Sequence, residues 1–267
     1  MSKTILVTGA SSGFGLLIAT QLHESGYNVI GTSRNPEKQQ SEVPFKLMAL
    51  DIADDASVVS FVKNLFGQIQ QLDVLINNAG NLLTGLAEET PVELGKQQFE
   101  TNFWGTVKLT NALLPYFRKQ KQGKIITVGS LLGLLSLPNV AYYAASKHAL
   151  EGYFKSLRFE LNQFNISVSM IEPATFKTNI GNSATAATGQ IKDYDLFRQK
   201  ISAYTKQEFE NAPSPKPVID TVLKVVEAEA PKFSYPVGKG HSFLLTMQRF
   251  AFKTLENAIL KRVNAAN

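Results

Sequence analysis

Short apolar runs alternate with longer amphipathic segments along most of this chain, and this alternation limits the possible folds more than any other feature. The runs are rich in β-branched and aliphatic residues, which is typical of strands buried on both faces of a sheet. They lie at residues 5–8, 28–32, 45–50, 73–76, 124–128 and 166–171. Segments with helical spacing lie at residues 16–25, 55–70, 93–119 and 141–164. We therefore expect an α/β fold, with a doubly wound parallel sheet that has helices on both faces.

The last third of the chain follows a looser pattern. Residues 181–189 are rich in Ala, Thr and Gly and predict a loop, and helices are expected at 193–211, 218–229 and 243–263. Because no linker or repeat interrupts the 267 residues, we expect a single domain over 1–267, with 179–267 as a helical C-terminal extension that covers the substrate. The basic amphipathic helix at 243–263 is expected to pack on its own domain, while a membrane surface and a partner subunit remain alternatives.

Composition excludes several classes of protein. Hydrophobic residues make up 44% of the chain and charged residues 18%, as in a packed globular protein. The net charge of +5 is spread along the sequence, so we expect no nucleic-acid partner. The absence of cysteine excludes disulfides, cysteine zinc sites and thiol nucleophiles, and we expect no metal. No apolar stretch has the length of a signal peptide or a membrane span, so we expect a cytoplasmic protein without an integral membrane segment.

A glycine-rich turn joins the first predicted strand to the first helix. Its sequence is Thr-Gly-Ala-Ser-Ser-Gly-Phe-Gly, with glycines at Gly9, Gly13 and Gly15. Glycines let the backbone approach a pyrophosphate closely, and the N-terminus of the following helix offers free N–H groups and partial positive charge. The turn therefore predicts a phosphate site, although a purely structural turn is the alternative.

The end of the second strand bears on the choice of cofactor. A carboxylate at this place binds the ribose 2′-hydroxyl of NAD, but the chain has Ser33 and Arg34 there instead. An arginine can pair with a 2′-phosphate. We therefore expect NADP(H), with an ordinary surface role for Arg34 as the alternative.

A tyrosine and a lysine stand four residues apart in the predicted helix 141–164. Tyr143 and Lys147 share one helix face, so the ammonium group is expected to lower the pKa of the phenol and to let it exchange a proton with a carbonyl or alcohol oxygen. Ser130 follows the strand at 124–128, at the edge of the sheet where ligands bind, and its hydroxyl can donate to the same oxygen. Tyr142 is the weaker candidate, because its partner four residues on is Ser146, which carries no charge.

Together these motifs resemble those of the short-chain dehydrogenase/reductase family, in its single-domain, Rossmann-like branch. The resemblance covers about residues 3–178 and includes its retinol- and hydroxysteroid-type members. Its motifs fall at Thr8–Gly15, Asn77–Gly80, Asn102, Ser130, Tyr143, Lys147 and Pro173–Thr178. The last of them departs from the family pattern, because Ala174 replaces a glycine.

The resemblance implies four catalytic residues. Tyr143 is the general acid in reduction and the general base in oxidation, and Lys147 lowers its pKa and holds the nicotinamide ribose. Ser130 orients the substrate oxygen, and Asn102 bends a helix and keeps a water in a proton relay to Lys147. The implied cofactor-binding residues are Gly9, Ser11, Ser12, Gly13, Phe14, Gly15, Ser33, Arg34, Asp51, Ile52, Asn78, Ala79, Gly80, Tyr143, Lys147, Pro173, Thr175, Phe176 and Thr178.

The expected function is therefore hydride transfer between NADP(H) and a small-molecule carbonyl or secondary alcohol. An apolar steroid-, retinoid- or lipid-like ketone or aldehyde is expected, under an apolar lid that includes Phe176, Phe197, Tyr204 and Phe209. A non-catalytic NADP(H)-binding regulator is the alternative, and a sugar-nucleotide epimerase or dehydratase is a more distant one.

The family resemblance also implies a homodimer or homotetramer. The pairing surface is expected on the two long helices, 93–119 and 141–164. Phe103, Trp104 and Leu113 face either a partner or the core.

Overall fold

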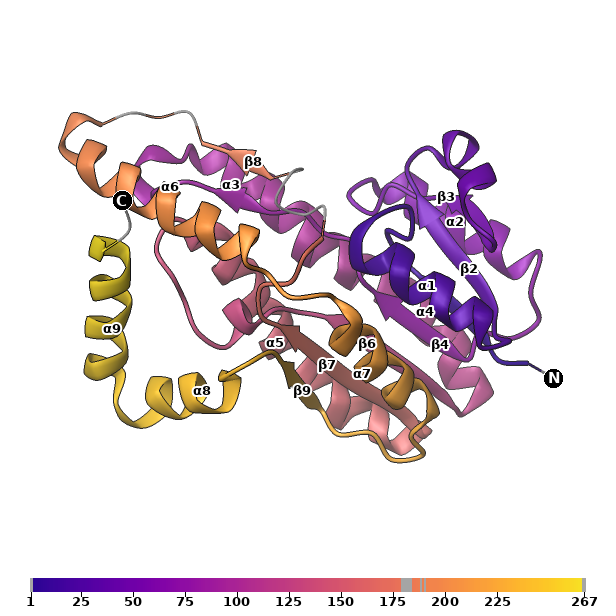
Figure 1. Ribbon diagram of the computed structural model, residues 1–267. Coiled ribbons are helices and arrows are strands. Elements are labelled where there is room, and N and C mark those ends of the chain that lie inside the picture. The colour runs from indigo at the N-terminus through magenta and orange to yellow at the C-terminus, as the bar shows by residue number, and fades with distance from the viewer. Residues whose placement is uncertain (1, 179–183, 188, 190, 266–267) are drawn as a thin grey trace.

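One parallel sheet of seven strands forms the centre of the molecule (Figure 1). The computed structural model describes residues 2–178, 184–187, 189 and 191–265. In the order β3-β2-β1-β4-β6-β7-β9, the strands are Lys46–Ala49, Asn28–Ser33, Thr4–Val7, Val74–Asn77, Gly123–Val128, Ile166–Pro173 and Ser234–Val237. The order reverses between β1 and β4, so the loops at their carboxyl ends separate and leave room for a ligand. The expected α/β fold with a doubly wound parallel sheet is confirmed.

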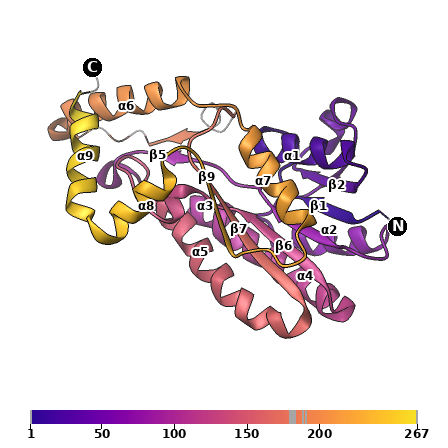
Figure 2. The ribbon, with the colours of Figure 1, turned by 60° about the horizontal axis from the view of Figure 1, so that its bottom comes forward.

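Helices cover both faces of this sheet (Figures 1 and 2). One face carries α2 (Asp55–Phe66), α4 (Thr106–Gln120) and α5 (Ala141–Leu161), and the other carries α1 (Gly13–Glu24) and α7 (Lys216–Glu227). Strand residues alternate between the two cores, as in β1, where Leu6 packs against the first layer while Ile5 and Val7 pack against the second. This arrangement explains the continuous apolar runs in the sequence, because both faces of each strand are buried.

The long helical segment expected at 93–119 is interrupted. It consists of α3 (Val92–Phe99), a π-helical turn (Glu100–Gly105) and α4. Within the turn, the Thr106 hydroxyl donates to the carbonyl of Asn102 at 3.0 Å. Such π turns are often found at functional sites, and here the turn places Asn102 beside the carboxyl end of β4.

The C-terminal segment differs from the expected single helix at 243–263. It forms two helices, α8 (His241–Phe250) and α9 (Phe252–Ala265), which are separated at Ala251, where φ is −144°. The turn lets Val263 of α9 pack against Ile201 of α6 (Asp195–Glu210). Neither glycine nor proline marks the break, so local sequence gave no signal for it.

Three strands lie outside the predicted ones. The edge strand β9 contains Pro236, which an edge position tolerates because one side of the strand needs no ladder hydrogen bond. The two-residue strands β5 (Leu83–Thr84) and β8 (Thr185–Ala186) pair with each other, and β8 lies in the segment expected to be a loop. The remaining short 3₁₀ helices are Pro36–Lys38, Gln40–Glu42, Ala87–Glu89, Leu131–Gly133, Asn162–Phe164 and Lys192–Tyr194.

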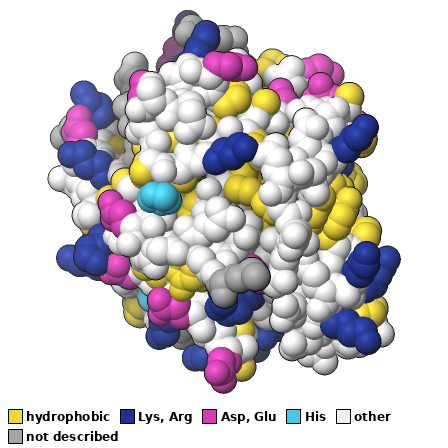
Figure 3. Space-filling view, turned by 90° about the vertical axis from the view of Figure 1, so that its right-hand side faces the viewer, with side chains coloured by type: hydrophobic (Ala, Val, Ile, Leu, Met, Phe, Trp, Pro, Cys, Tyr) yellow, Lys and Arg dark blue, Asp and Glu magenta, His cyan; other side chains and the backbone are white. Residues whose placement is uncertain are grey.

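Charge is dispersed over the face at the β2–β3 end of the sheet. In Figure 3 the Lys and Arg side chains are spread over this face, and Asp and Glu side chains lie between them. Within the described part of the chain, none of the helices combines the length and apolarity needed to cross a bilayer.

Candidate active site

The glycine-rich turn lies at the carboxyl end of β1 and lines a cavity of about 960 Å³. Gly9 and Gly13 have left-handed backbones, with φ of 64° and 55°. A Cβ on Gly15 would lie 2.2 Å from the carbonyl oxygen of Gly9, so only glycine fits there. Gly15 is also the one residue of the predicted turn site, Gly9 and Ser11–Gly15, that packs behind the cavity wall and does not line it.

The start of α1 fits a phosphate group. The helix begins at Gly13, three residues before the predicted start, and the Ser12 side chain at its N-cap makes no capping hydrogen bond. No described atom lies within 4 Å of a Cβ built on Gly13, so the cavity is open at this point. The first N–H groups of the helix therefore have room for an anion, as the predicted role of the turn requires.

Thr8 fixes the turn to the neighbouring strand. Its hydroxyl oxygen accepts hydrogen bonds from the backbone N–H groups of Asn78 and Ala79, both at 2.9 Å. The Asn78 amide in turn donates to the carbonyl of Thr8 at 2.8 Å. This anchoring role of Thr8 is visible only in the folded chain. The buried amide of Asn77 instead bridges Thr110 and Thr127 within the fold.

The cofactor residues predicted at the ends of β2 and β3 also line this cavity. Arg34 is exposed at its edge, and the Ser33 hydroxyl donates to the side-chain carbonyl of Gln39. Asp51 is exposed and Ile52 is buried. The strand β2 therefore ends with the hydroxyl group of Ser33. The guanidinium group of Arg34 and then Asn35 follow it along the chain.

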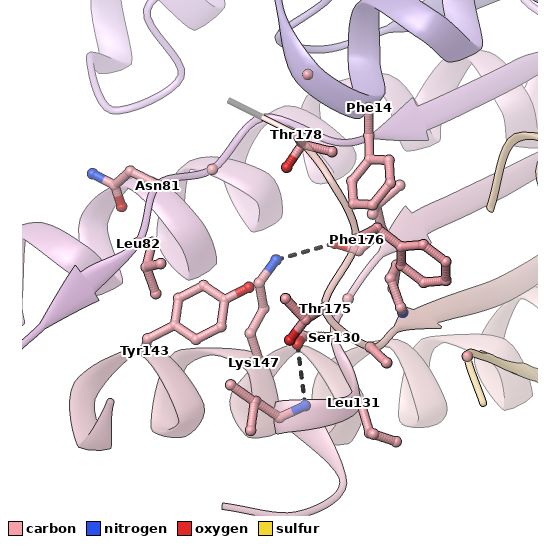
Figure 4. Close-up of a pocket in the computed structure, with 18 of the residues that line it drawn as sticks. Phe14, Asn81, Leu82, Ser130, Leu131, Tyr143, Lys147, Thr175, Phe176 and Thr178 are labelled. Atoms are coloured by element: carbon pink, nitrogen blue, oxygen red, sulfur yellow. Dashed lines mark hydrogen bonds between the residues drawn. The ribbon is translucent and has the colours of Figure 1, made fainter. Parts of the chain in front are cut away.

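Ser130, Tyr143 and Lys147 converge on one part of the cavity (Figure 4). Tyr143 and Lys147 lie in the first two turns of α5, and the ammonium nitrogen lies 5.7 Å from the centre of the phenol ring. Lys147 donates to the carbonyl of Val128 at the end of β6, at 3.1 Å. Ser130 follows the same strand and accepts from the N–H of Leu132 at 3.1 Å. Three groups that can handle protons thus share one buried site.

Burial governs the ionisation of these groups. It raises the pKa of Tyr143, and a hydrogen bond with Ser130 opposes the shift. The expected lowering of this pKa by Lys147 is therefore not found in the chain alone. Burial also lowers the pKa of Lys147 to about 8, an effect that the carboxylate of Glu151 opposes. Desolvation disfavours the charged form of both groups, so it favours the neutral phenol of Tyr143 and makes the Lys147 ammonium easier to deprotonate than a free lysine.

Two buried carboxyl groups behind the site were not singled out from the sequence. Burial raises the pKa of Glu151 to about 8 and that of Glu172 to about 7. One oxygen of each carboxyl group has no hydrogen-bond partner among the described residues. Glu151 lies below the loop of Ser130, since a Cβ on Gly129 would meet its oxygen at 3.2 Å. Its position four residues after Lys147 on the same helix face was the signal available in the sequence.

Asn102 lies in the π-helical turn and is buried next to the cavity without lining it. Its side-chain carbonyl accepts from the N–H of Asn81 at 2.9 Å, and its amide donates to the carbonyl of Asn81 at 3.0 Å. Gln98, which the sequence did not single out, donates to the same carbonyl at 3.0 Å and accepts from the N–H of Leu83 at 2.7 Å. Both side chains fix the loop after β4, and the water relay implied for Asn102 stays a prediction.

The segment after β7 completes the cofactor side of the cavity. Pro173, Thr175, Phe176 and Thr178 line it, as do Asn78, Ala79 and Gly80 from the loop after β4. Phe176 meets Phe14 edge to face, with ring centres 6.2 Å apart. Ala174, which replaces the glycine of the family pattern, lies opposite Gly238. A Cβ on Gly238 would lie 2.6 Å from the Ala174 methyl group, so the glycine at 238 leaves room for this alanine.

The opposite end of the cavity is mainly apolar and belongs largely to the C-terminal extension, which also contributes Glu208 and Arg262 to the lining. Its aliphatic and thioether side chains are Leu82, Leu135, Leu137, Leu244, Met247, Leu255 and Ile259. Of the aromatic residues expected in a lid, Tyr204 and Phe209 line this end. Phe197 packs between α6 and α9 instead. Residues 181–183 and 188 of the expected loop at 181–189 lie outside the described residues.

Tyr142 packs against a neighbouring helix and Leu113 packs in the core. The Tyr142 ring lies on α3, where a Cβ on Gly95 would come within 2.3 Å of it. Leu113 is fully buried in the core, whereas Trp104 is half exposed. Of the residues proposed for a partner surface, only Trp104 is therefore largely accessible.

This sheet, its glycine turn and the adjacent serine, tyrosine and lysine define a Rossmann-like oxidoreductase. The family model of the short chain dehydrogenases matches residues 3–189. The chain belongs to the short-chain dehydrogenase/reductase family, and it resembles the retinol-type dehydrogenases within that family.

Relatives match over most of their length. The chain is 37% identical to the uncharacterized oxidoreductase YusZ of Bacillus subtilis (strain 168), over 98% of both chains. It is 37% identical to the 3-ketodihydrosphingosine reductase of Bacteroides thetaiotaomicron, over 88% of both. It is 30% identical to human retinol dehydrogenase 8, over 92% of this chain and 85% of that one.

A solved structure shows the same architecture. It is that of a short-chain dehydrogenase from Streptomyces avermitilis, with a TM-score of 0.84 and 28% sequence identity. The match covers the whole of both chains. The C-terminal helices of the present chain therefore have counterparts in a solved relative.

Proposed function

We propose that this protein is an NADP(H)-dependent oxidoreductase that interconverts an apolar ketone or aldehyde and the corresponding alcohol. The observation that carries the proposal is the convergence of Ser130, Tyr143 and Lys147 between an open phosphate turn and an apolar cavity end. When bound, the nicotinamide supplies or accepts the hydride.

The side chains of the site handle the oxygen and the proton. The hydroxyls of Ser130 and Tyr143 donate to the carbonyl oxygen of the substrate and stabilise the negative charge that develops there during reduction. Tyr143 then delivers its proton to that oxygen, and in oxidation it accepts the proton back. The Lys147 ammonium, anchored on Val128, stabilises the phenolate that remains. Asn102 keeps its proposed place in a relay that returns a proton to Lys147.

Preference for NADP(H) is supported by the end of β2. Arg34 is exposed at the cavity edge, where it can pair with a 2′-phosphate, and the Ser33 hydroxyl stands where a carboxylate would select NAD. The adenine is proposed to lie near Asp51 and Ile52, the adenosine near Asn78, Ala79 and Gly80, and the nicotinamide near Thr178. Ser11, Ser12, Gly13 and Phe14 are proposed to hold the pyrophosphate.

A large apolar substrate is supported by the cavity and by relatives. Leu135, Leu137, Met247 and Leu255 supply apolar side chains to this end of the cavity, which Glu208 and Arg262 also line. Two relatives carry the names of a 3-ketodihydrosphingosine reductase and a retinol dehydrogenase. We therefore propose a lipid-, retinoid- or steroid-like ketone or aldehyde, covered by the extension at 179–267 of a single domain.

The test is a panel of carbonyl substrates assayed with NADPH and NADH in parallel. Steady consumption of NADPH with long apolar ketones or aldehydes is expected. Tight NADPH binding without turnover across the panel favours the non-catalytic regulator instead.

We also propose a homodimer or homotetramer formed through the α3–α4 and α5 helices. The half-exposed Trp104 supports this surface, as does Phe159 of α5, which is 75% exposed. We also propose that the enzyme is cytoplasmic, a location that the lack of cysteine permits.

A further inference from the structure

The corner between α8 and α9 presents aromatic side chains to solvent. We define this corner as residues 249–253, Arg-Phe-Ala-Phe-Lys. Phe250 is 75% exposed and Phe252 is 56% exposed, and neither lines the cavity. In Figures 1 and 2 the corner lies at the outer end of the C-terminal extension, away from the sheet. Packing of the described chain does not explain two exposed phenylalanines on either side of Ala251 at such a tip.

The apolar surface continues from the corner to the mouth of the cavity. Phe243 stands seven residues before Phe250, on the same face of α8, and it is 66% exposed while also lining the cavity. Leu244 and Met247 line the cavity from the same helix. The helix α8, which forms part of the cavity wall, therefore also carries exposed aromatic side chains that run from the cavity mouth to the corner.

Cations are frequent in the segment that carries these aromatic side chains, and Arg249 and Lys253 flank the corner itself. The segment 239–262 contains five exposed cations, Lys239, Arg249, Lys253, Lys261 and Arg262. Its only acid is Glu256, which pairs with Lys253. The guanidinium of Arg249 lies 5.2 Å from the ring centre of Phe250, beside the aromatic tip. The segment 239–262 therefore carries more positive than negative charge.

This combination selects one kind of partner. A second copy of the chain docked on the same corner would bring the cations of both copies together around a two-fold axis, which is unfavourable. Exposed aromatic side chains flanked by Lys and Arg suit the interface of a bilayer, where rings enter the headgroup region and cations meet anionic lipids. The charge and the exposed rings are therefore complementary to an anionic membrane surface.

We propose that the α8–α9 corner docks on the surface of bilayers that contain anionic lipids, with Phe250 and Phe252 at headgroup depth. Docking places Phe243 and the cavity mouth next to the bilayer. An apolar substrate then enters from the membrane, a consequence that rests on the proposed function, whereas docking itself does not depend on activity.

Sedimentation with vesicles tests the proposal on the full chain. Vesicles of equal parts phosphatidylglycerol and phosphatidylcholine are compared with vesicles of phosphatidylcholine alone. The chain is expected to sediment with the anionic vesicles and to be released by high salt. The double variant Phe250→Ser/Phe252→Ser is expected to lose about tenfold or more in vesicle affinity. Its melting temperature is expected to match that of the parent, because both side chains are exposed.

Val59→Ser serves as the matched control, since Val59 is a 70% exposed apolar residue on α2, far from the corner. This variant is expected to bind vesicles like the parent. The proposal is overturned if the parent fails to sediment with anionic vesicles, or if the double variant binds as well as the parent. It is also overturned if light scattering shows that the double variant loses a dimer that the parent forms. Because the assay measures no turnover, its result tests membrane docking independently of the proposed reaction.

Discussion

Tyr143 and Lys147 share one face of α5, and both are almost entirely buried. Their spacing suggests that the ammonium group stabilises the phenolate and lowers the pKa of the phenol. Burial opposes this effect, because it raises the pKa of the phenol and lowers that of the ammonium group. A bound cofactor and substrate change this balance by adding charge and hydrogen bonds. The reactivity of the pair is therefore expected to develop in the complex more than in the free protein.

Replacing Arg34 tests the choice of cofactor. In Arg34→Ala, KM for NADPH is expected to rise about tenfold or more, because a charge-assisted hydrogen bond to the 2′-phosphate is lost. KM for NADH and kcat are expected to stay unchanged. Lys38→Ala is the matched control, since Lys38 is an exposed cation on the same segment that does not line the cavity. An unchanged KM for NADPH in Arg34→Ala contradicts the assignment.

Glu151 makes stability depend on pH. The pKa of Glu151 is raised to about 8 in the folded protein. At a pH below the pKa of an unfolded glutamate, the group is protonated in both states and its burial does not lower stability through ionisation. As pH rises from there through the folded pKa, the unfolded chain gains free energy by ionising, and the folded protein loses stability. Glu151→Gln is therefore expected to raise the free energy of unfolding at about pH 8, on the order of 2 kcal/mol, and much less at about pH 5. Urea denaturation at both pH values measures this, and an equal effect at both contradicts it.

At the scale of elements, the strands of the sheet could be predicted because burial on both faces gives them continuous apolar sequences. The site residues at strand ends could be predicted with them, since Ser130 and Arg34 follow such runs directly. The break at Ala251 and the edge strand β9 could not, because they depend on distant packing against α6 and β7. Glu151 was missed for a similar reason, since its burial comes from other elements.

The glycine turn gives a test at this scale. In Gly15→Ala the added methyl would meet the carbonyl oxygen of Gly9 at 2.2 Å and the amide of Asn78 at 2.4 Å. The first βα junction must then shift, with an expected loss of about 1–3 kcal/mol in stability and a weaker affinity for NADPH. Gly152→Ala, in α5 with no described atom within 4 Å, is expected to be neutral or stabilising by up to about 1 kcal/mol. Equal melting temperatures for the two variants contradict this account.

At the scale of the whole molecule, segments far apart in the sequence build one cavity. Its polar end comes from the first βα junction and the loops after β2, β3 and β4, and its apolar end comes largely from α6, α8 and α9. The middle of the cavity holds Ser130, Tyr143 and Lys147, the groups placed to act on a substrate oxygen. These central residues could be predicted from the sequence better than the apolar end could. Their motifs have fixed local spacings, whereas the apolar end depends on how distant segments pack together.

The most direct measurement of the central claim is the rate of NADPH oxidation with a long-chain apolar ketone or aldehyde, in the parent and in Tyr143→Phe. The parent is expected to turn over. The variant is expected to lose at least about 100-fold in kcat, because the proton donor is absent, while its affinity for NADPH stays within a few fold. Full activity in Tyr143→Phe contradicts the account, as does a parent that binds NADPH but reduces no carbonyl compound in the panel.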